Sequence, residues 1–422
     1  MAKVKFGKLV SDTLKKGKIG GESFAPSYST GIDLLDYMNG RMEGSEVVKG
    51  VSGGKIVTVV GKSGSGKSTL AYQIAGMVLK SNPDAQVIHL DYERSANKAR
   101  ISMMSKVPID EIFNGSDVWN YMNSNISSES LYKLVKAIYD IKMSNKDDIT
   151  IEEEFNGAKV SYVVPTVLIV DSVAAMTPSD IIEEAELSGP MSASAIARSN
   201  NAIYKRISNF ITDANIMIIN INHITQTIAM GVPKKPILNF LSMDESVPGG
   251  SSALFMADSL IKLDPGTKLD PEKDFGIKGF ISNCQFIKSR SNSSGRKFNL
   301  VFDQEKGFDN LLTSIQYLKE AKLLLGSGHG YYIETMPDKK FKMKNVRELY
   351  DTDKEFRDGF DSYMKEVYYE LLSGKFDGEI EEQFILEKLV DEEQGIWKAN
   401  DGKYYIITDE ESGECEEVEY NE

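Results

Sequence analysis

Apolar runs alternate with segments of helical periodicity along the central part of the chain. Continuous apolar runs that indicate buried strands occur at 55–60 and within "AQVIHLDYE", "TVLIVD" and "IMIININH". Helical spacing follows the first run in "GKSTLAYQIAGMVLK" and returns in "SLYKLVKAIYDIK". Strands that are apolar along their whole length are typical of a parallel sheet with both faces covered. The pattern therefore predicts an α/β fold.

Three further stretches depart from this alternation. Asn156 and Gly157 separate two strand-like runs within 149–164, which predicts a β-hairpin with a two-residue turn. The stretches 179–191 and 224–248 fit neither a helix nor a strand. Irregular segments longer than about 12–15 residues inside a compact domain are usually functional or disordered. We therefore expect both stretches to be irregular loops with a role in function.

The two ends of the chain differ from its centre. Phe6, Leu9, Val10 and Leu14 recur at helical spacing among lysines, which predicts a short amphipathic helix that packs on its own core or docks to a partner. "GKIGGES" then indicates a linker. After residue 310 the pattern favours helices with a few short strands. The predicted units are an N-terminal helix and linker at 1–44, a core at 45–310, a small α+β C-terminal domain at 311–407 and a tail at 408–422.

Composition and charge narrow the class of protein. The 422 residues are 41% hydrophobic and 27% charged, as in an ordinary soluble globular protein. No apolar run approaches about 18 residues, so we expect no membrane span. Cys284 and Cys415 lie too far apart for a metal-binding spacing, which favours a reducing intracellular compartment.

The net charge of −14 is unevenly distributed. Residues 1–20 hold six lysines and one acid, which sums to +5. The last 15 residues carry eight acids and no Lys or Arg. Such a block repels itself, and we predict a disordered tail. The overall acidity argues against a large basic surface, but it permits a nucleic-acid groove of local residues and backbone amides.

A phosphate-binding motif lies between the first strand and the first helix. "GKSGSGKST" fits the pattern G-x-x-x-x-G-K-[ST] in the strand–loop–helix context that this motif requires. Its backbone N–H groups and the helix N-terminus would hold phosphate oxygens, while the lysine neutralises the β- and γ-phosphates. The predicted ATP-binding residues are Gly61, Ser63, Gly64, Ser65, Gly66, Lys67, Ser68 and Thr69.

Polar side chains follow the apolar strands at the edge where this loop lies. Asp171 ends "TVLIVD", and we predict that it and the Ser68 hydroxyl hold Mg²⁺. Hydrolysis also needs a group that orients water toward the γ-phosphate, for which Asp91 and Glu93 are equally suitable. His223 ends "IMIININH" and is either a contact to the γ-phosphate or a hydrogen-bonded residue at a strand end.

These motifs together resemble the RecA family of recombinases. "YSTGIDLLD", "GKSGSGKSTLAYQIA", "DYE", "VLIVDSVAAMTPSD", "INH" and "PGGSSALFMADSLIKL" occur in the family's order over about residues 28 to 305. "QFIKSRSNSSGRKFNLVF", "GYYIETMP" and the acidic tail resemble the UvsX-type recombinases of tailed phages. The resemblance implies a RecA-like P-loop ATPase core, with the short N-terminal helix serving oligomerisation.

The resemblance also implies roles for individual residues. Glu93 would activate water, which decides between it and Asp91, and His223 would sense the γ-phosphate. Lys288 and Arg290 would reach the ATP of the neighbouring subunit and stabilise charge in the transition state. Where relatives place an aromatic residue over the adenine, this chain has Arg100, whose guanidinium either stacks on the base or points to water.

The two irregular stretches would correspond to the family's DNA-binding loops. In the first, Met191 would wedge between bases, and the stretch leads to Arg198. In the second, an aromatic side chain could stack on a base, worth about 1–3 kcal/mol, and glycines could offer N–H groups to a phosphate. The candidate residues of the second loop are Lys234, Lys235, Phe240, Gly249 and Gly250.

The resemblance thus implies an ATP- and Mg²⁺-dependent recombinase in the cytoplasm, of the host cell if a phage encodes it. It would form helical filaments on single-stranded DNA, pair these filaments with double-stranded DNA and exchange strands, with mediator and single-strand-binding proteins as candidate partners. The alternatives are a ring-shaped RecA-like helicase or motor, a filament that coats DNA without strand exchange, and a small-molecule kinase, which would not need the two long loops. We further hypothesise that the acidic tail competes with DNA for a cationic groove.

Overall fold

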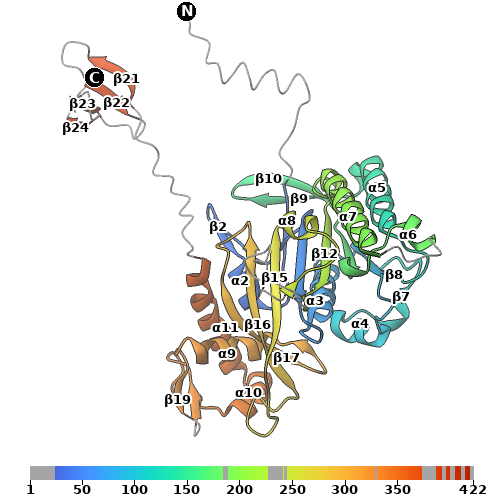
Figure 1. Ribbon diagram of the computed structural model, residues 1–422. Coiled ribbons are helices and arrows are strands. Elements are labelled where there is room, and N and C mark those ends of the chain that lie inside the picture. Colours follow the sequence, from blue (N-terminus) through green and yellow to red (C-terminus); the bar gives the residue numbers. More distant parts are fainter. Residues whose placement is uncertain are drawn as a thin grey trace, which may run out of the picture.

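The computed structural model of the chain describes residues 24–183, 189–226, 241, 245–327, 330–372, 386–391, 396–399, 404–409 and 414–418 (Figure 1). The predicted N-terminal helix and the predicted DNA contacts Lys234, Lys235 and Phe240 lie outside these residues. Within them, no helix combines the length and the apolar character needed to cross a membrane.

Ten strands form the central sheet in the order β18-β17-β16-β15-β5-β12-β11-β6-β8-β7. The seven from β15 to β7 run parallel, whereas β16, β17 and β18 continue the sheet in antiparallel fashion. The prediction of a mostly parallel sheet is therefore confirmed. The strands are β5 Ile56–Gly61, β6 Gln86–Asp91, β7 Ile112–Phe113, β8 Trp119–Met122, β11 Thr166–Asp171, β12 Ile216–His223, β15 Ser259–Lys268, β16 Gly279–Ser289, β17 Lys297–Asp303 and β18 Gly307–Phe308.

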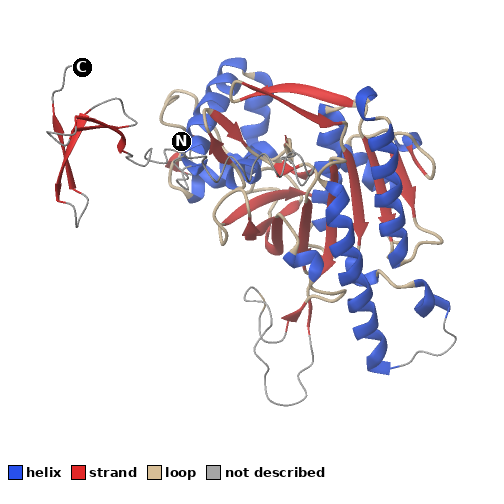
Figure 2. Ribbon diagram, turned by 90° about the horizontal axis from the view of Figure 1, so that it is seen from above, coloured by secondary structure: helices blue, strands red, loops and turns tan. Residues whose placement is uncertain are grey.

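Helices cover both faces of the sheet, as Figure 2 shows from above. Val57 and Val59 of β5 point into one hydrophobic cluster, and Ile56 and Val60 point into the other. This alternation explains why the strand is apolar at every position. The first cluster includes helices α2 Asp33–Met38, α3 Lys67–Ser81 and α4 Lys98–Ser105. The second includes α5 Ser128–Ser144, α7 Gly189–Ile211 and α8 Ser252–Phe255.

Segments outside the predicted core boundaries also pack on the sheet. Leu34 and Leu35 of α2 are buried in the first cluster, so the folded core begins before residue 45. Leu312 and Phe356 lie in the same cluster, which places the described segments between 310 and 372 against the central sheet. Their helices are α9 Asn310–Glu320, α10 Val346–Thr352 and α11 Lys354–Tyr369. Short strands nearby are β1 Ser27–Tyr28, β2 Arg41–Glu43, β3 Glu46–Val48, β4 Val51–Ser52, β19 Leu325–Ser327 and β20 Gly330–Tyr332.

The predicted hairpin is present as β9 (Thr150–Phe155) and β10 (Ala158–Val163). Asn156 and Gly157 at its tip have φ values of 50° and 72°, as a two-residue turn of this type requires. The Asn156 side chain donates to the carbonyl of Glu43 over 2.7 Å and accepts from the backbone N–H of Ser45 over 3.1 Å. The tip of this hairpin is thereby fastened to the turn between β2 and β3.

The structure corrects the expectation for 179–191. Residues 179–183 form helix α6 (Ser179–Glu183), and α7 begins at Gly189, so only 184–188 fall outside the described residues. Met191 therefore belongs to a helix and not to an irregular loop, and the same helix contains Arg198. The sequence "LSGPMSASA" hides this start, because Gly and Pro are otherwise signals of a break.

The predicted disordered tail is also wrong in part. Strands β23 (Tyr404–Asp409) and β24 (Glu414–Val418) complete a four-stranded sheet with β21 (Leu386–Asp391) and β22 (Ile396–Ala399). The backbone register places Glu416 opposite Ile406 and Glu417 opposite Tyr405, and it opposes two acids only at Asp409 and Glu414 among the described pairs. Because repulsion between directly opposed charges is mostly avoided, the acidic run can pair as a strand.

Candidate nucleotide-binding site

The phosphate loop joins the end of β5 to the start of α3. Gly66 has a φ of 92°, and a Cβ there would lie 2.7 Å from the Phe308 ring. At Gly61 a Cβ would lie 2.1 Å from the carbonyl oxygen of Leu263 in the neighbouring strand. The loop can therefore follow this path only with glycine at both positions. The structure confirms the strand–loop–helix arrangement of residues 61–69.

Lys67 and Ser65 supply groups that suit a phosphate. The Lys67 side chain is buried, and its Nζ donates to the carbonyl of Lys62 over 2.8 Å. Burial lowers the pKa of Lys67, an effect that the carboxylates of Asp171 and Glu93 oppose. The Ser65 hydroxyl is fully buried and has no hydrogen-bond partner within the described part of the chain. Buried polar groups are usually satisfied, so this loop has donors available for phosphate oxygens.

Asp171 and Ser68 meet beside the loop and fit a hard cation. The Ser68 hydroxyl donates to Asp171 Oδ2 over 3.0 Å, which brings both predicted magnesium ligands together. Burial, together with the nearby carboxylates of Glu93 and Asp91, raises the pKa of Asp171 to about 6. A divalent cation would reverse this effect by favouring the ionised carboxylate. The oxygen donors and the excess of carboxylates therefore suit Mg²⁺, which would neutralise the phosphates of a bound ATP.

Glu93 lies in a hydrogen-bond network drawn from three strand ends. His223 Nε2 lies 2.9 Å from Glu93 Oε1, and the Ser172 hydroxyl donates to the same oxygen. These two hydrogen bonds lower the pKa of Glu93, the His223 contact having the larger effect and burial acting against both. The carboxylate is thus held ionised next to Lys67 and Asp171. Such a group can orient a water molecule toward a bound phosphate.

The structure distinguishes Glu93 from Asp91, which the strand pattern alone leaves equivalent. Asp91 is fully buried and accepts hydrogen bonds from the Tyr121 hydroxyl over 2.7 Å and from the N–H groups of Ser95 and Ala96 over 3.3 and 3.0 Å. These contacts shape the turn that presents Glu93. Asp91 therefore acts as a structural acceptor, whereas the half-exposed Glu93 is the carboxylate available to water.

Arg100 lies beside the phosphate loop. One guanidinium nitrogen donates to the carbonyl of Gln304, and another lies 3.4 Å from the Thr69 hydroxyl. The guanidinium carbon lies 5.8 Å from the centre of the Phe302 ring, within cation–π range. The side chain is thus held against α3 and β17, and its predicted stacking on adenine stays a prediction.

Lys288 and Arg290 lie at the opposite edge of the sheet. Ser289 pairs with Ser259, which is level with Val57 of β5, four residues before the phosphate loop begins. At about 3.3 Å per residue, the two edges are at least about 13 Å apart along the strands. The Lys288 ammonium donates to the carbonyl of Phe255 over 2.6 Å. This basic pair therefore cannot serve the nucleotide of its own protomer in this arrangement.

A buried acid accompanies this basic pair. The carboxylate of Asp258 is buried, and its Oδ2 has no hydrogen-bond partner within the described residues. Burial raises the pKa of Asp258, and the charges of Lys55, Arg290, Arg41 and Lys288 oppose that effect. The backbone N–H of Arg290 donates to the Asp258 carbonyl over 3.1 Å. Sequence reasoning missed Asp258, although its place directly before an apolar strand was a usable signal.

Of the predicted DNA contacts, the structure describes Arg198, Gly249 and Gly250 with their surroundings. Arg198 is exposed on α7. Gly249 and Gly250 have φ values of 90° and 102° and precede α8. Asn200 of α7 donates to the Gly249 carbonyl over 3.1 Å, so α7 and this turn are in contact. Their binding to DNA stays a prediction.

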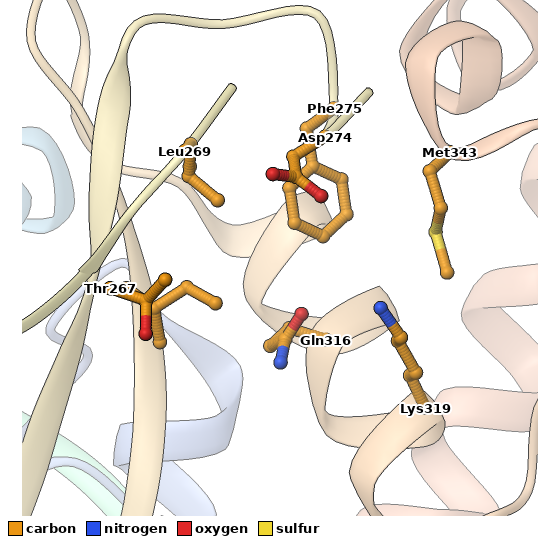
Figure 3. A pocket seen from close by; sticks show the side chains of 8 residues that line it. Thr267, Leu269, Asp274, Phe275, Gln316, Lys319 and Met343 are labelled. Atoms are coloured by element: carbon orange, nitrogen blue, oxygen red, sulfur yellow. The ribbon is translucent and has the colours of Figure 1, made fainter. Parts of the chain in front are cut away.

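A cavity elsewhere in the molecule does not coincide with these residues. It has a volume of about 220 Å³ and lies between the β15–β16 connection and α9 (Figure 3). Its lining includes Thr267, Asp274, Phe275, Gln316, Lys319 and Met343. None of these belongs to the phosphate loop or to the Glu93 network. The chemistry of the loop identifies the nucleotide site, whereas cavity volume does not.

Comparison with known proteins supports this assignment. Residues 46–169 match a family model described as ABC transporter, a range that includes β5, the phosphate loop, α3 and most of β11. The chain contains a P-loop ATPase domain. This domain implies binding of ATP with Mg²⁺ and points to nucleotide hydrolysis. No curated protein matches the chain.

Proposed function

We propose that the protein is a RecA-type recombinase, a DNA-dependent ATPase that assembles as a filament on single-stranded DNA and exchanges strands with a homologous duplex. The observation that carries this proposal is the separation of two incomplete half-sites. The phosphate loop, Asp171 and Glu93 lie at one edge of the sheet, and Lys288 and Arg290 lie at the other.

A nucleotide between two protomers would join these half-sites. The interface would be heterologous, because one edge of a protomer would meet the opposite edge of the next, and such contacts build open filaments or rings. Arg290 and Lys288 would then stabilise the charge of the transferring phosphoryl group in trans. Glu93 would orient the attacking water, and its contact with His223 would report phosphate occupancy to the chain that follows β12.

The ATPase domain alone would equally suit other motors, since its matched family model carries the description ABC transporter. The motif order of the RecA resemblance and the two separated half-sites favour recombination. ATP turnover with and without single-stranded DNA, together with electron micrographs, tests the proposal. We expect turnover to rise with DNA and open helical filaments to form with ATP and Mg²⁺.

Other outcomes of this experiment would reject the proposal. Closed rings that unwind duplex would indicate a helicase. Filaments that fail to pair a homologous duplex in a strand-exchange assay would indicate a DNA-coating protein. A protomer that stays alone in the presence of ATP, Mg²⁺ and oligonucleotide would exclude the shared site altogether.

A further inference from the structure

An ion pair connects the phosphate loop to a short two-stranded ribbon. Lys62 is the second residue of the loop, and its Nζ lies 3.2 Å from Glu245 Oε1. The Glu245 side chain is only 6% exposed, whereas that of Lys62 is 49% exposed. A carboxylate buried to this degree is costly unless it is paired. The cation of the phosphate loop therefore stabilises the position of Glu245.

Glu245 belongs to a ribbon that begins next to the catalytic network. Strands β13 (Thr225–Gln226) and β14 (Glu245–Ser246) pair in antiparallel fashion, with Gln226 opposite Glu245. The hydroxyls of Thr225 and Ser246 lie 3.1 Å apart. β13 starts two residues after His223, whose ring contacts Glu93. The ribbon thus contacts the nucleotide site twice, through His223 before one strand and through Glu245 in the other.

Lys62 also contacts Lys67, the lysine predicted to bind phosphate. In this structure the Lys67 ammonium donates to the Lys62 carbonyl over 2.8 Å. A triphosphate in the loop would attract the Lys67 ammonium away from that carbonyl. The same triphosphate would present anionic oxygens close to the Lys62 ammonium, which is half-exposed and carried by a flexible stem. Two anions, Glu245 and the terminal phosphate, would then be within reach of one cation.

We propose that Glu245 and the terminal phosphate of the nucleotide compete for Lys62, and that Glu245 is the residue through which the phosphate loop positions the β13–β14 ribbon. The ion pair holds the ribbon when the loop lacks a triphosphate. Binding of ATP transfers Lys62 to the phosphate and releases Glu245. Because coupling between two sites is reciprocal, a ligand that moves the ribbon changes the affinity for ATP by the same factor. This last step rests on the proposed function, in which the ligand is single-stranded DNA.

The variant Glu245→Gln tests the competition, because it keeps the shape of the side chain and removes its charge. Without the negative charge of Glu245, the attraction of Lys62 to the terminal phosphate meets less competition, and we expect a non-hydrolysable ATP analogue to bind about fivefold more tightly. The affinity for ADP, which lacks the terminal phosphate, stays unchanged. Equilibrium binding by calorimetry without DNA measures both. An unchanged or weaker affinity for the ATP analogue overturns the proposal, and so does an equal shift for ADP.

Two further variants separate this effect from a structural one. Glu272→Gln breaks a Lys344–Glu272 pair of 3.0 Å that is remote from the loop, and it leaves both affinities unchanged. In a Lys62→Gln background, adding Glu245→Gln has no further effect on affinity. A persisting effect there shows that Glu245 acts without Lys62, which overturns the proposal.

The DNA arm is separate from these measurements. In the wild type we expect single-stranded DNA to tighten binding of the ATP analogue. In Glu245→Gln we expect DNA to add little, because the substitution has already removed the competition for Lys62 and the analogue already binds more tightly without DNA. A full DNA effect in the variant overturns the coupling through Glu245. A wild type that shows no DNA effect rejects the proposed function instead, while the comparison of ATP with ADP still decides whether Glu245 and phosphate compete.

Discussion

The two edges of the parallel sheet carry opposite excesses of charge. At the carboxyl ends of the strands, the carboxylates of Asp171 and Glu93 act on one buried lysine, Lys67, and burial together with Glu93 and Asp91 raises the pKa of Asp171 to about 6. At the amino ends, Lys55, Arg41, Lys288 and Arg290 surround one buried acid, Asp258. Each edge therefore lacks the charge that the other supplies.

The comparison shows how an active site can be divided. The acidic edge has a phosphate loop and needs cations, which Mg²⁺ supplies in part. The basic edge has cations but, among the residues that the structure describes, no phosphate loop. A triphosphate placed between an acidic edge and the basic edge of a second copy would satisfy both. The predictions below test whether the two edges act as halves of one site.

The largest effect is expected from Glu93→Gln. The amide keeps the hydrogen-bonding shape of the side chain but cannot act as a base toward water. We expect kcat to fall by about 10³- to 10⁴-fold, while ATP and DNA binding persist. Steady-state ATP turnover and nucleotide titration measure the two properties. Turnover near the wild-type rate in the presence of DNA would show that Glu93 is not the activating carboxylate.

A slightly smaller loss is expected from Arg290→Ala at the other edge. Lys288 remains as a second cation, so we expect turnover to fall by about 10³-fold. This is near the lower end of the range of rate contributions known for a cation supplied in trans. The lone protomer should bind ATP normally, because Arg290 lies far from its own phosphate loop. Arg357→Ala, on the exposed side of α11, serves as the control and should leave turnover intact.

Mixing these two inactive variants sharpens the comparison. A protomer with Glu93→Gln still has Arg290, and one with Arg290→Ala still has Glu93. In a random equimolar mixture about a quarter of heterologous interfaces combine both intact residues. We therefore expect about a quarter of the wild-type turnover to return. A mixture as inactive as its components would show that the two edges do not share a nucleotide.

The sequence predicted the acidic edge better than the basic one for a physical reason. The phosphate loop and the Asn156-Gly157 turn are local, since a few adjacent residues determine each backbone path. The contacts of Glu93 with Ser172 and His223 join three strand ends far apart in the chain, so only the sheet order brings them together. The electrostatic surroundings of Asp258 likewise depend on cations from several elements far apart in the chain.

Two misassigned segments have the same cause. The Gly-Pro pair at 189–190 favours a break locally, yet α7 extends from it, with its later turns buried against β12 and α5. The acidic run at 414–418 suggests disorder locally, yet cross-strand pairing gives each of Glu416 and Glu417 an uncharged neighbour. In both cases pairing or packing with distant residues outweighs the local signal.

The raised pKa of Asp171 predicts a pH-dependent difference between the two edges. Its folded pKa of about 6 exceeds its ordinary value of 3.8, so folding favours the protonated carboxyl. This contribution is present below about pH 4 and is lost as the pH rises through 6. Asp171→Asn should therefore stabilise the ligand-free protein at pH 7.5 by up to about 3 kcal/mol, and hardly at all near pH 4.

Urea unfolding at the two pH values measures this difference, with and without Mg²⁺ and ATP. The ligand should stabilise the wild type strongly and Asp171→Asn much less, because the metal needs the ionised carboxylate. Asp258→Asn is the matched control at the basic edge, since it also removes a buried carboxylate whose pKa burial raises. Its response to Mg²⁺ and ATP should equal that of the wild type. An equal loss of response in both variants would contradict a magnesium role specific to Asp171.

The smallest effect is expected from the acidic C-terminal part, which extends the contrast of charges beyond the sheet. Residues 373–422 contain 17 acids and four lysines, a net −13 of the total −14, so the rest of the chain is nearly neutral. If this part competes with DNA for cationic residues, its removal should tighten duplex binding by about fivefold at low salt and less at high salt.

The whole unit must be deleted, because removing only 408–422 would take away β24 and leave β23 unpaired on one side. Fluorescence anisotropy at several salt concentrations measures the effect, and a full-length variant with Glu416 and Glu417 changed to Gln should show a smaller shift in the same direction. Equal affinity of the full and shortened chains at all salt concentrations would leave the acidic unit without a competing role.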